Sequence, residues 1–169
     1  MKLIVIRGPA GCGKTEIANR LAATLKAEVL HVDWLKTALR QADADATWPE
    51  IRSRAYVLAV ERLQESEKTG VVAVVLEELL TDASFVRALQ EFCVANGVEA
   101  RWFRIRRPME EMLAVENSSE RTARPVRNSR EDLEEMERGL DATAVSGEVV
   151  IENDASIAAA VERIKSALV

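Results

Sequence analysis

The chain has 169 residues, of which 48% are hydrophobic and 30% charged, with a formal net charge of −5. We therefore expect one domain over residues 1–169 with a sizeable core, and no generic electrostatic binding to nucleic acid or anionic membrane. The sequence lacks an apolar run of about 18 residues and a signal-peptide pattern, and its two cysteines have no metal-ligand spacing, so we expect a cytoplasmic protein.

Apolar runs alternate with segments of helical periodicity along the chain. Short apolar runs predict five strands, at Leu3–Ile6, Val29–Val32, Val71–Leu76, Ala100–Ile105 and Val149–Ile151. Helical spacing of apolar residues is clearest in Ile17–Leu25, Ile51–Leu63 and Ile157–Leu168. The segment Asp43–Glu50 predicts a loop, because it contains small residues and Pro49. This alternation indicates an α/β fold with a parallel sheet.

The first strand leads into the sequence GPAGCGKT, which fits the pattern G-x-x-x-x-G-K-[ST] at every fixed position. In this pattern, glycines turn backbone N–H groups toward phosphate oxygens, and a helix N-terminus adds partial positive charge. We expect the loop to bind ATP through Gly8, Pro9, Ala10, Gly11, Cys12, Gly13, Lys14 and Thr15. The alternative is a glycine turn that only connects a strand to a helix.

For three residues of this loop, the sequence predicts more specific roles. Lys14 places a full charge near the β- and γ-phosphates, and Thr15 offers a hydroxyl to Mg²⁺. Cys12 is either a redox-sensitive thiol or a small residue that contributes its backbone N–H.

The rest of the sequence favours a small kinase over other classes of nucleotide-binding protein. The guanine-reading N-K-x-D motif of GTPases does not occur. The chain is also too short for an ABC ATPase with its signature motif, or for an AAA+ motor with its lid domain. Small kinases place a substrate-binding excursion after the second strand and an arginine-bearing lid late in the chain.

The segment HVDWLKTALR follows the second strand and predicts an acceptor site. Lys36 and Arg40 lie one and two helical turns beyond Asp33, on roughly one face. At the carboxyl edge of a sheet, Asp33 can accept a proton from an attacking hydroxyl, although it could instead only cap a helix. The alternatives stay open for this residue.

Two carboxylates, Glu77 and Glu78, come directly after the most strand-like run. A carboxylate there can hold Mg²⁺ through water or bind the acceptor. We favour Glu77 because it follows the apolar run at once; the alternative is a surface acid at a helix start.

The late segment ENSSERTARPVR predicts an arginine-bearing lid at about residues 117–129. Arg121 and Arg124 are the preferred catalytic arginines, ahead of Arg127, because guanidinium groups neutralise charge on a transferring phosphoryl group. The alternative is a solvated basic loop. The arginines near the fourth strand, Arg104, Arg106 and Arg107, are interpreted as edge or surface charge.

Several other residues keep two interpretations. His31 stands alone in a strand, and a structural role is preferred over catalysis. Trp48 and Tyr56 could line an acceptor pocket or pack in the core.

With these motifs in place, the sequence resembles the P-loop kinases of the nucleoside-monophosphate-kinase type. The branch that looks most similar contains polynucleotide 5′-hydroxyl kinases, zeta toxins, chloramphenicol phosphotransferases and shikimate- and gluconate-kinase-like proteins. The resemblance extends over nearly the whole chain, but only the loop at Gly8–Thr15 is specific. It implies a three-layer fold whose five parallel strands are ordered 2-3-1-4-5, with helices on both faces.

The resemblance also assigns roles to residues. It implies that Asp33 is the base and that Lys36 contacts a phosphate or other anion of the acceptor. The segment Pro108–Leu140 resembles the lid and the helix after it, and Val149–Ser156 resembles the strand and turn that pass near adenine. The chain departs from the pattern at Glu116, where the family often has arginine.

The expected activity is transfer of the γ-phosphate of ATP, with Mg²⁺, to a hydroxyl of a small-molecule or nucleotide acceptor. Asp33, Lys36, Arg40 and Glu77 are the expected acceptor-binding residues, and Thr15 and Glu77 the expected metal ligands. A nucleic-acid 5′ end is not favoured, since no basic track with aromatic residues is evident. The sequence does not indicate an oligomeric state.

Two rival functions remain. A nucleotide-binding regulator with slow or no hydrolysis would need the phosphate loop but not Asp33. A nucleoside-monophosphate kinase would need arginines after the second strand, which Arg40, Arg52 and Arg54 could supply.

Overall fold

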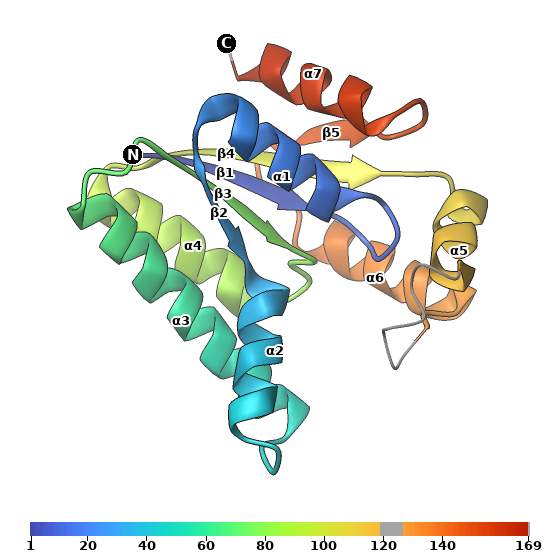
Figure 1. Cartoon of the computed structure of the whole chain (residues 1–169), viewed down its shortest axis with the longest axis horizontal. Helices are drawn as coiled ribbons and strands as arrows, with labels where there is room; N and C mark the ends of the chain where they lie inside the picture. The colour runs from blue at the N-terminus through green and yellow to red at the C-terminus, as the bar shows by residue number, and fades with distance from the viewer. Residues whose placement is uncertain (119–126, 169) are drawn as a thin grey trace.

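A computed structural model of the chain describes residues 1–118 and 127–168 (Figure 1). Its strands are β1 (Lys2–Arg7), β2 (Glu28–His31), β3 (Ala73–Glu78), β4 (Glu99–Arg106) and β5 (Val149–Glu152). Its helices are α1 (Lys14–Leu25), α2 (Val32–Ala42), α3 (Trp48–Lys68), α4 (Ala83–Asn96), α5 (Met109–Asn117), α6 (Arg130–Ala142) and α7 (Ile157–Ala167). Within these residues, no helix has the length and apolar character needed to cross a membrane.

The strands form one parallel sheet in the order β2-β3-β1-β4-β5, which confirms the expected topology. The central strand β1 pairs with β3 and β4, so Arg7 lies opposite both Glu78 and Arg104. His31, at the end of β2, lies opposite Glu77. The register therefore brings several charged side chains to the carboxyl edge of the sheet.

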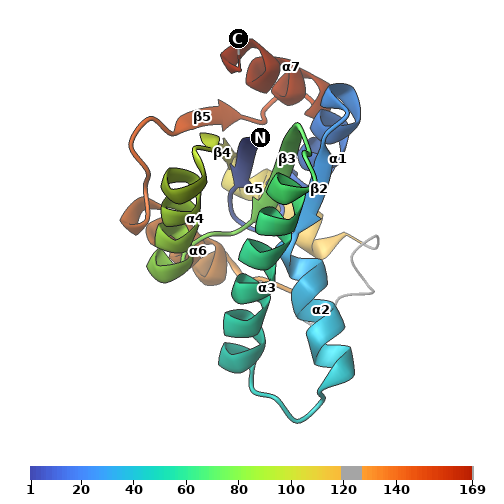
Figure 2. The same ribbon diagram turned by 90° about the vertical axis from the view of Figure 1, so that its left-hand side faces the viewer.

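Alternate residues of the central strands enter two separate cores, as expected for a sheet covered on both faces. On one face, Leu3 and Val5 pack with residues of α3 and α4. On the other, Ile4 and Ile6 pack with residues of α1 and α7. Figures 1 and 2 show these helix pairs on opposite sides of the sheet, with α5 beyond the carboxyl ends of the strands.

Local capping signals set the start of α6 and the end of α4. Ser129 caps α6 by accepting a hydrogen bond from the N–H of Asp132, whose carboxylate accepts one from the N–H of Ser129. Helix α4 ends at Gly97 in the left-handed conformation, which glycine adopts without strain.

Three boundaries differ from the sequence prediction. Helix α3 begins inside the predicted loop Asp43–Glu50, because Thr47 and Glu50 form a capping box and Pro49 fits the first turn. Strand β2 ends at His31, so Val32 belongs to α2. Strand β3 is shifted from Val71–Leu76 to Ala73–Glu78, so the paired glutamates lie within the strand and not after it.

A buried arginine, Arg7, ties β1 to the C-terminal end of α6. Its guanidinium donates hydrogen bonds to the carbonyl oxygens of Leu140 (2.5 Å) and Thr143 (2.8 Å), where helix carbonyls carry partial negative charge. Its Nε lies 3.1 Å from Oε1 of Glu148. Burial lowers the pKa of Arg7 and raises that of Glu148, and the attraction between the two charges partly offsets both effects.

The prediction that Arg104 is surface charge is wrong. Arg104 is buried in β4 and binds two carboxylates of α6, those of Glu137 and Asp141. Arg106, two residues further on, is exposed as predicted. Arg7 and Arg104 thus both attach α6 to the same face of the sheet.

We expect Arg7→Met to lower the free energy of unfolding by about 3–5 kcal/mol, because it leaves the Glu148 carboxylate and two helix carbonyls buried without their partner. Urea denaturation measures the change. The matched control is Arg101→Met in β4, which breaks an exposed pair with Glu99 and should cost about 0–1 kcal/mol.

A double variant tests the cause. Adding Glu148→Gln to Arg7→Met should recover part of the loss, since it removes the unpaired charge. A loss from Arg7→Met no larger than that from Arg101→Met would contradict the assigned role.

Candidate active site

The phosphate loop connects β1 to α1 at the carboxyl edge of the sheet. Gly13, the residue before the helix, has φ 91°, and a Cβ there would lie 2.7 Å from Nδ2 of Asn153 and 2.9 Å from Cδ1 of Ile157. Backbone conformation and close packing therefore both require glycine at this position. The N-terminus of α1 therefore lies at the carboxyl edge of the sheet, where its partial positive charge favours an anion.

Neighbouring segments hold the loop in place. The side-chain amide of Asn153, which follows β5, donates a hydrogen bond of 2.8 Å to the carbonyl oxygen of Cys12. A Cβ on Gly11 would lie 2.9 Å from the carbonyl oxygen of Met112 in α5. The Cys12 thiol is fully buried, and burial raises its pKa, so the thiol is not activated and the residue acts as a small core side chain. The sequence analysis marked the segment Val149–Ser156 but did not single out Asn153 within it, because a lone asparagine after a strand has no distinguishing pattern.

Lys14 begins α1, and its ammonium points to β3. Its Nζ lies 3.6 Å from Oε1 of Glu77 and donates to the carbonyl oxygen of Pro9 at 3.4 Å. Burial acts to lower the pKa of Lys14, but the carboxylates of Glu77, Asp33 and Glu78 outweigh it, so the pKa is raised. Lys14 therefore stays charged.

Glu77 and His31 form a buried pair at the ends of adjacent strands. Nδ1 of His31 lies 3.0 Å from Oε2 of Glu77, and Nε2 lies 3.0 Å from Oδ1 of Asn19 in α1. His31 thus orients Glu77 toward the phosphate loop, which agrees with the structural role preferred for this histidine. Among the described residues, Oε1 of Glu77 accepts no hydrogen bond and has only the ion pair with Lys14.

Glu78 points to the opposite face of the sheet from Glu77, because successive side chains of a strand alternate. Its two carboxylate oxygens accept hydrogen bonds of 2.8 and 2.7 Å from Nζ of Lys36 in α2. The same ammonium donates a third hydrogen bond, of 3.1 Å, to Oδ1 of Asp33. The side chains of Glu78 and Lys36 are 3% and 8% exposed, whereas that of Asp33 is 46% exposed.

The structure therefore brings together five charged residues at the sheet edge: Lys14, Asp33, Lys36, Glu77 and Glu78. Asp33 is not the cap of α2, since the helix starts at Val32 and Asp33 lies in its first turn. Strand alternation places Glu77 beside Lys14 of the phosphate loop and Glu78 beside Lys36 of α2.

Other predicted residues are placed elsewhere. Arg40 is exposed, and its guanidinium donates to the carbonyl oxygen of Ala46 in the connection between α2 and α3. Trp48 is exposed at the start of α3, and Tyr56 stacks on Phe85 with ring centroids 4.0 Å apart. Arg121 and Arg124 lie outside the described residues.

Glu116, the departure from the family pattern, has a structural contact. Its Oε2 accepts hydrogen bonds from the backbone N–H (3.2 Å) and the side-chain amide (2.8 Å) of Asn128. The glutamate is buried at the end of α5 and joins it to the residue two positions before α6.

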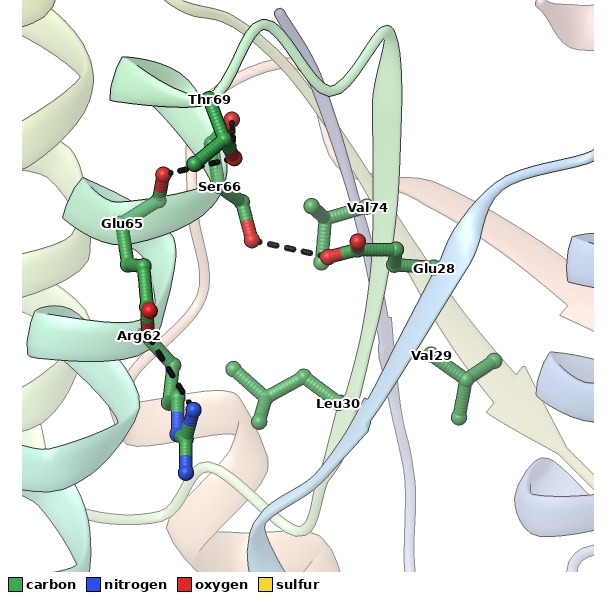
Figure 3. A pocket seen from close by; sticks show the side chains of 8 residues that line it. All are labelled: Glu28, Val29, Leu30, Arg62, Glu65, Ser66, Thr69 and Val74. Atoms are coloured by element: carbon green, nitrogen blue, oxygen red, sulfur yellow. Dashed lines mark hydrogen bonds and ion pairs between the residues drawn. The ribbon is translucent and has the colours of Figure 1, made fainter.

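A polar cavity of about 380 Å³ lies at the opposite edge of the sheet. Figure 3 shows it between β2 and α3, where Ser66 donates a hydrogen bond to Glu28 and Arg62 donates one to Glu65. Because Glu28 begins β2, this cavity is at the amino ends of the strands, away from the phosphate loop.

The fold and the loop define a P-loop nucleotide-binding domain. A family model described as an AAA domain matches residues 3–143, and the chain belongs to that family. No protein among those with curated function matches the sequence.

Solved structures of similar fold include kinases. A shikimate kinase from Acinetobacter baumannii has a TM-score of 0.73 at 16% identity, covering 99% of this chain and 93% of that chain. A gluconokinase from Sinorhizobium meliloti 1021 has a TM-score of 0.66 at 16% identity, covering 99% and 95%. The tunicamycin resistance protein of Deinococcus radiodurans has a TM-score of 0.73 at 18% identity, covering 99% and 95%. The chain therefore has the fold of P-loop kinases.

Proposed function

We propose that the chain is an ATP-dependent phosphotransferase that acts on a hydroxyl group of a small-molecule or nucleotide acceptor. The observation that carries the proposal is a pair of ion-pair groups at the carboxyl edge of the sheet: Lys14 pairs with Glu77 at 3.6 Å, and Lys36 pairs with Glu78 at 2.7 Å and with Asp33 at 3.1 Å. A phosphate-binding cation and a partly solvent-accessible carboxylate thus lie at the same edge of the sheet, as transfer to a hydroxyl requires.

The residues present fit ATP and Mg²⁺. The loop fits G-x-x-x-x-G-K-[ST] at every fixed position and leads into the N-terminus of α1, and Lys14 would supply the charge for the β- and γ-phosphates. Thr15 and Glu77 would hold the metal, directly or through its water; Oε1 of Glu77 is buried and has no hydrogen-bond donor among the described residues. Bound Mg·ATP would supply the phosphoryl group.

The chain's own residues would then orient and deprotonate the acceptor. Asp33 would accept the proton of the attacking hydroxyl, since it lies in the first turn of α2 with its side chain partly open to solvent. Lys36 would hold the Asp33 carboxylate in position through the hydrogen bond of 3.1 Å. From the sequence alone, we propose that Arg121 and Arg124 neutralise charge on the transferring phosphoryl group.

The nucleoside-monophosphate-kinase alternative receives less support. Two of the arginines that it requires already have partners in the segment that connects α2 to α3. Arg40 donates to the carbonyl oxygen of Ala46, and Arg54 pairs with Asp43 at 2.9 Å. Such exposed contacts can be broken at little cost, so assays should still include nucleoside monophosphates.

The experiment is transfer of radiolabelled γ-phosphate from Mg·ATP to pooled hydroxyl compounds. The pools contain 5′-hydroxyl oligonucleotides, nucleosides, nucleoside monophosphates, nucleotide sugars, sugar acids and hydroxylated antibiotics. We expect a labelled product that is lost on replacement of Lys14 or Asp33. ATP binding without a labelled product from any pool would contradict the proposal and favour the regulator.

A further inference from the structure

The peptide group between Cys12 and Gly13 has two possible orientations in the phosphate loop. Gly13 lies at φ 91°, and glycine adopts positive and negative φ with similar ease, so rotation of the peptide plane before it meets little steric resistance. One orientation turns the Gly13 N–H toward a bound anion. The other turns the Cys12 carbonyl oxygen there, and its partial negative charge would repel a phosphate. The affinity of the loop therefore depends on what fixes this peptide.

The side chain of Asn153 fixes the orientation. Its Nδ2 donates a hydrogen bond of 2.8 Å to the Cys12 carbonyl oxygen, which directs that carbonyl toward the turn between β5 and α7. Because the peptide bond is trans, its C=O and N–H point in opposite directions, so the N–H of Gly13 faces away from that turn. A Cβ on Gly13 would lie 2.7 Å from Nδ2, so the amide packs directly on the peptide that it holds.

Asn153 is itself held firmly in the turn. Its backbone N–H donates a hydrogen bond of 2.8 Å to the carbonyl oxygen of Arg106, at the end of β4. In the same turn, Arg163 of α7 donates to the carbonyl oxygen of Glu152 and pairs with Asp154 at 3.0 Å. Asn153 is 5% exposed, so its side chain is not open to a ligand. The amide is therefore in place before any nucleotide binds, which is the condition for a preorganised site.

Two other described side chains donate to carbonyl oxygens of the loop, and both differ from Asn153. Nζ of Lys14 lies 3.4 Å from the Pro9 oxygen, and the Arg107 guanidinium lies 3.4 Å from the Gly11 oxygen. Both groups are charged, so replacing either would remove attraction for phosphate directly. Asn153 is neutral, and its replacement changes the support of the peptide without changing the charge around the loop.

We propose that Asn153 is a positioning residue for the polyphosphate chain of the nucleotide, because it holds the Cys12–Gly13 peptide so that the Gly13 N–H donates to a phosphate oxygen. This inference rests on the proposed function and adds to its nucleotide site a residue from outside the loop motif. Asn153 acts through the backbone of the loop and does not touch the nucleotide. It should therefore strengthen the binding of a polyphosphate with or without a base.

The test replaces Asn153 with leucine, which has a similar size but no hydrogen-bond donor. Calorimetry measures Kd for Mg·ATP and for inorganic tripolyphosphate, which has no base. We expect both Kd values to rise by about 10–100-fold, the usual effect of losing a hydrogen bond to a charged group. In transfer assays, KM for ATP should rise while kcat falls less, because the loop holds the phosphates in the ground state as well as in the transition state.

Asn96→Leu is the matched control. The Asn96 side-chain amide also donates a hydrogen bond of 2.8 Å to a backbone carbonyl, that of Phe92, but it lies at the end of α4, before the start of β4 and thus at the opposite edge of the sheet. Both variants lose the same kind of bond, and neither changes the net charge. Circular dichroism establishes that each is folded, since a variant that is about 90% folded would raise Kd only about 1.1-fold through stability alone.

A second measurement uses the unaltered protein. Gly13 is the one glycine of the sequence that follows a cysteine, so labelling cysteine carbonyls with ¹³C and glycine with ¹⁵N isolates the Gly13 N–H in the NMR spectrum. We expect this amide proton to move downfield when tripolyphosphate binds, because it then donates to a charged oxygen. An unchanged resonance at saturating tripolyphosphate would overturn the inference, whether or not Asn153→Leu folds.

The outcomes separate this inference from the proposed function. Weaker binding of ATP but not of tripolyphosphate would mean that Asn153 acts on the nucleoside, and would overturn the inference. Kd values equal to those of Asn96→Leu would also overturn it, and would leave the phosphotransferase intact. Weaker binding of both ligands without any labelled product would support the inference and contradict transfer. Binding of neither ligand by the unaltered chain would overturn both.

Discussion

Replacing Lys14 with alanine should lower phosphoryl transfer by about 10²–10³-fold, the usual effect of losing one group that stabilises developing charge. The ammonium is held at the start of α1 and stays charged, because carboxylates around it raise its pKa. In the nucleotide complex, the charge of Lys14 would act on the β- and γ-phosphates. Arg107 also adjoins the loop, but its guanidinium donates to the Gly11 carbonyl oxygen at 3.4 Å and pairs with Glu111 at 2.9 Å.

The measurement is steady-state transfer to whichever acceptor the pools identify, together with ATP affinity. Lys165→Ala is the matched control, since that lysine is in α7 and pairs with nearby Glu162 at 2.8 Å. Because Lys14 also pairs with the buried Glu77 at 3.6 Å, circular dichroism must establish that the variant is folded. Near-normal transfer by a folded Lys14→Ala protein would refute the assignment of the phosphate loop.

Replacing Asp33 with asparagine should lower transfer by about 10²–10⁴-fold while ATP affinity is retained. Asparagine keeps the shape of the side chain and an oxygen that can accept the hydrogen bond from Lys36, but it cannot accept a proton from the acceptor. The loss should therefore appear in kcat more than in KM.

Asp43→Asn is the matched control, because Asp43 is a partly exposed acid just past the end of the same helix and pairs with Arg54. Unchanged transfer in Asp33→Asn would reduce Asp33 to a helix-start acid. Equal losses of transfer and ATP affinity would instead mean that the substitution disturbs the nucleotide site.

The parts of the molecule that depend on local sequence were predicted well. The phosphate loop is a contiguous motif, and the strands are apolar runs, so both are visible without a structure. The strand order was available only from the family resemblance, since pairing between distant strands leaves no local pattern. The misplaced start of α3 comes from interpreting Pro49 as a loop residue when it occupies a first helical turn.

The roles of the charged residues were harder to predict from the sequence, because each role depends on which helix or strand packs against that side chain. The sequence alone predicts that Arg104 is a surface charge. Only the fold shows that α6 lies beside it and supplies two carboxylates as its partners. Glu78 was ranked below Glu77, although strand alternation gives each a different lysine partner. Arg7 stands between an apolar run and a glycine, and only the fold reveals that it binds the end of a helix 133 residues away.

Trp34 gives the chain a built-in optical probe. Its indole is exposed, adjoins the proposed base in sequence and contacts His31, whereas Trp102 is buried in β4 and Trp48 begins another helix. Indole emission depends on local polarity and on nearby quenching groups, so the difference in fluorescence between the unaltered chain and a Trp34→Phe variant isolates events at the sheet edge. Occupancy of this position can thus be followed in real time with unlabelled compounds, before any product has been identified.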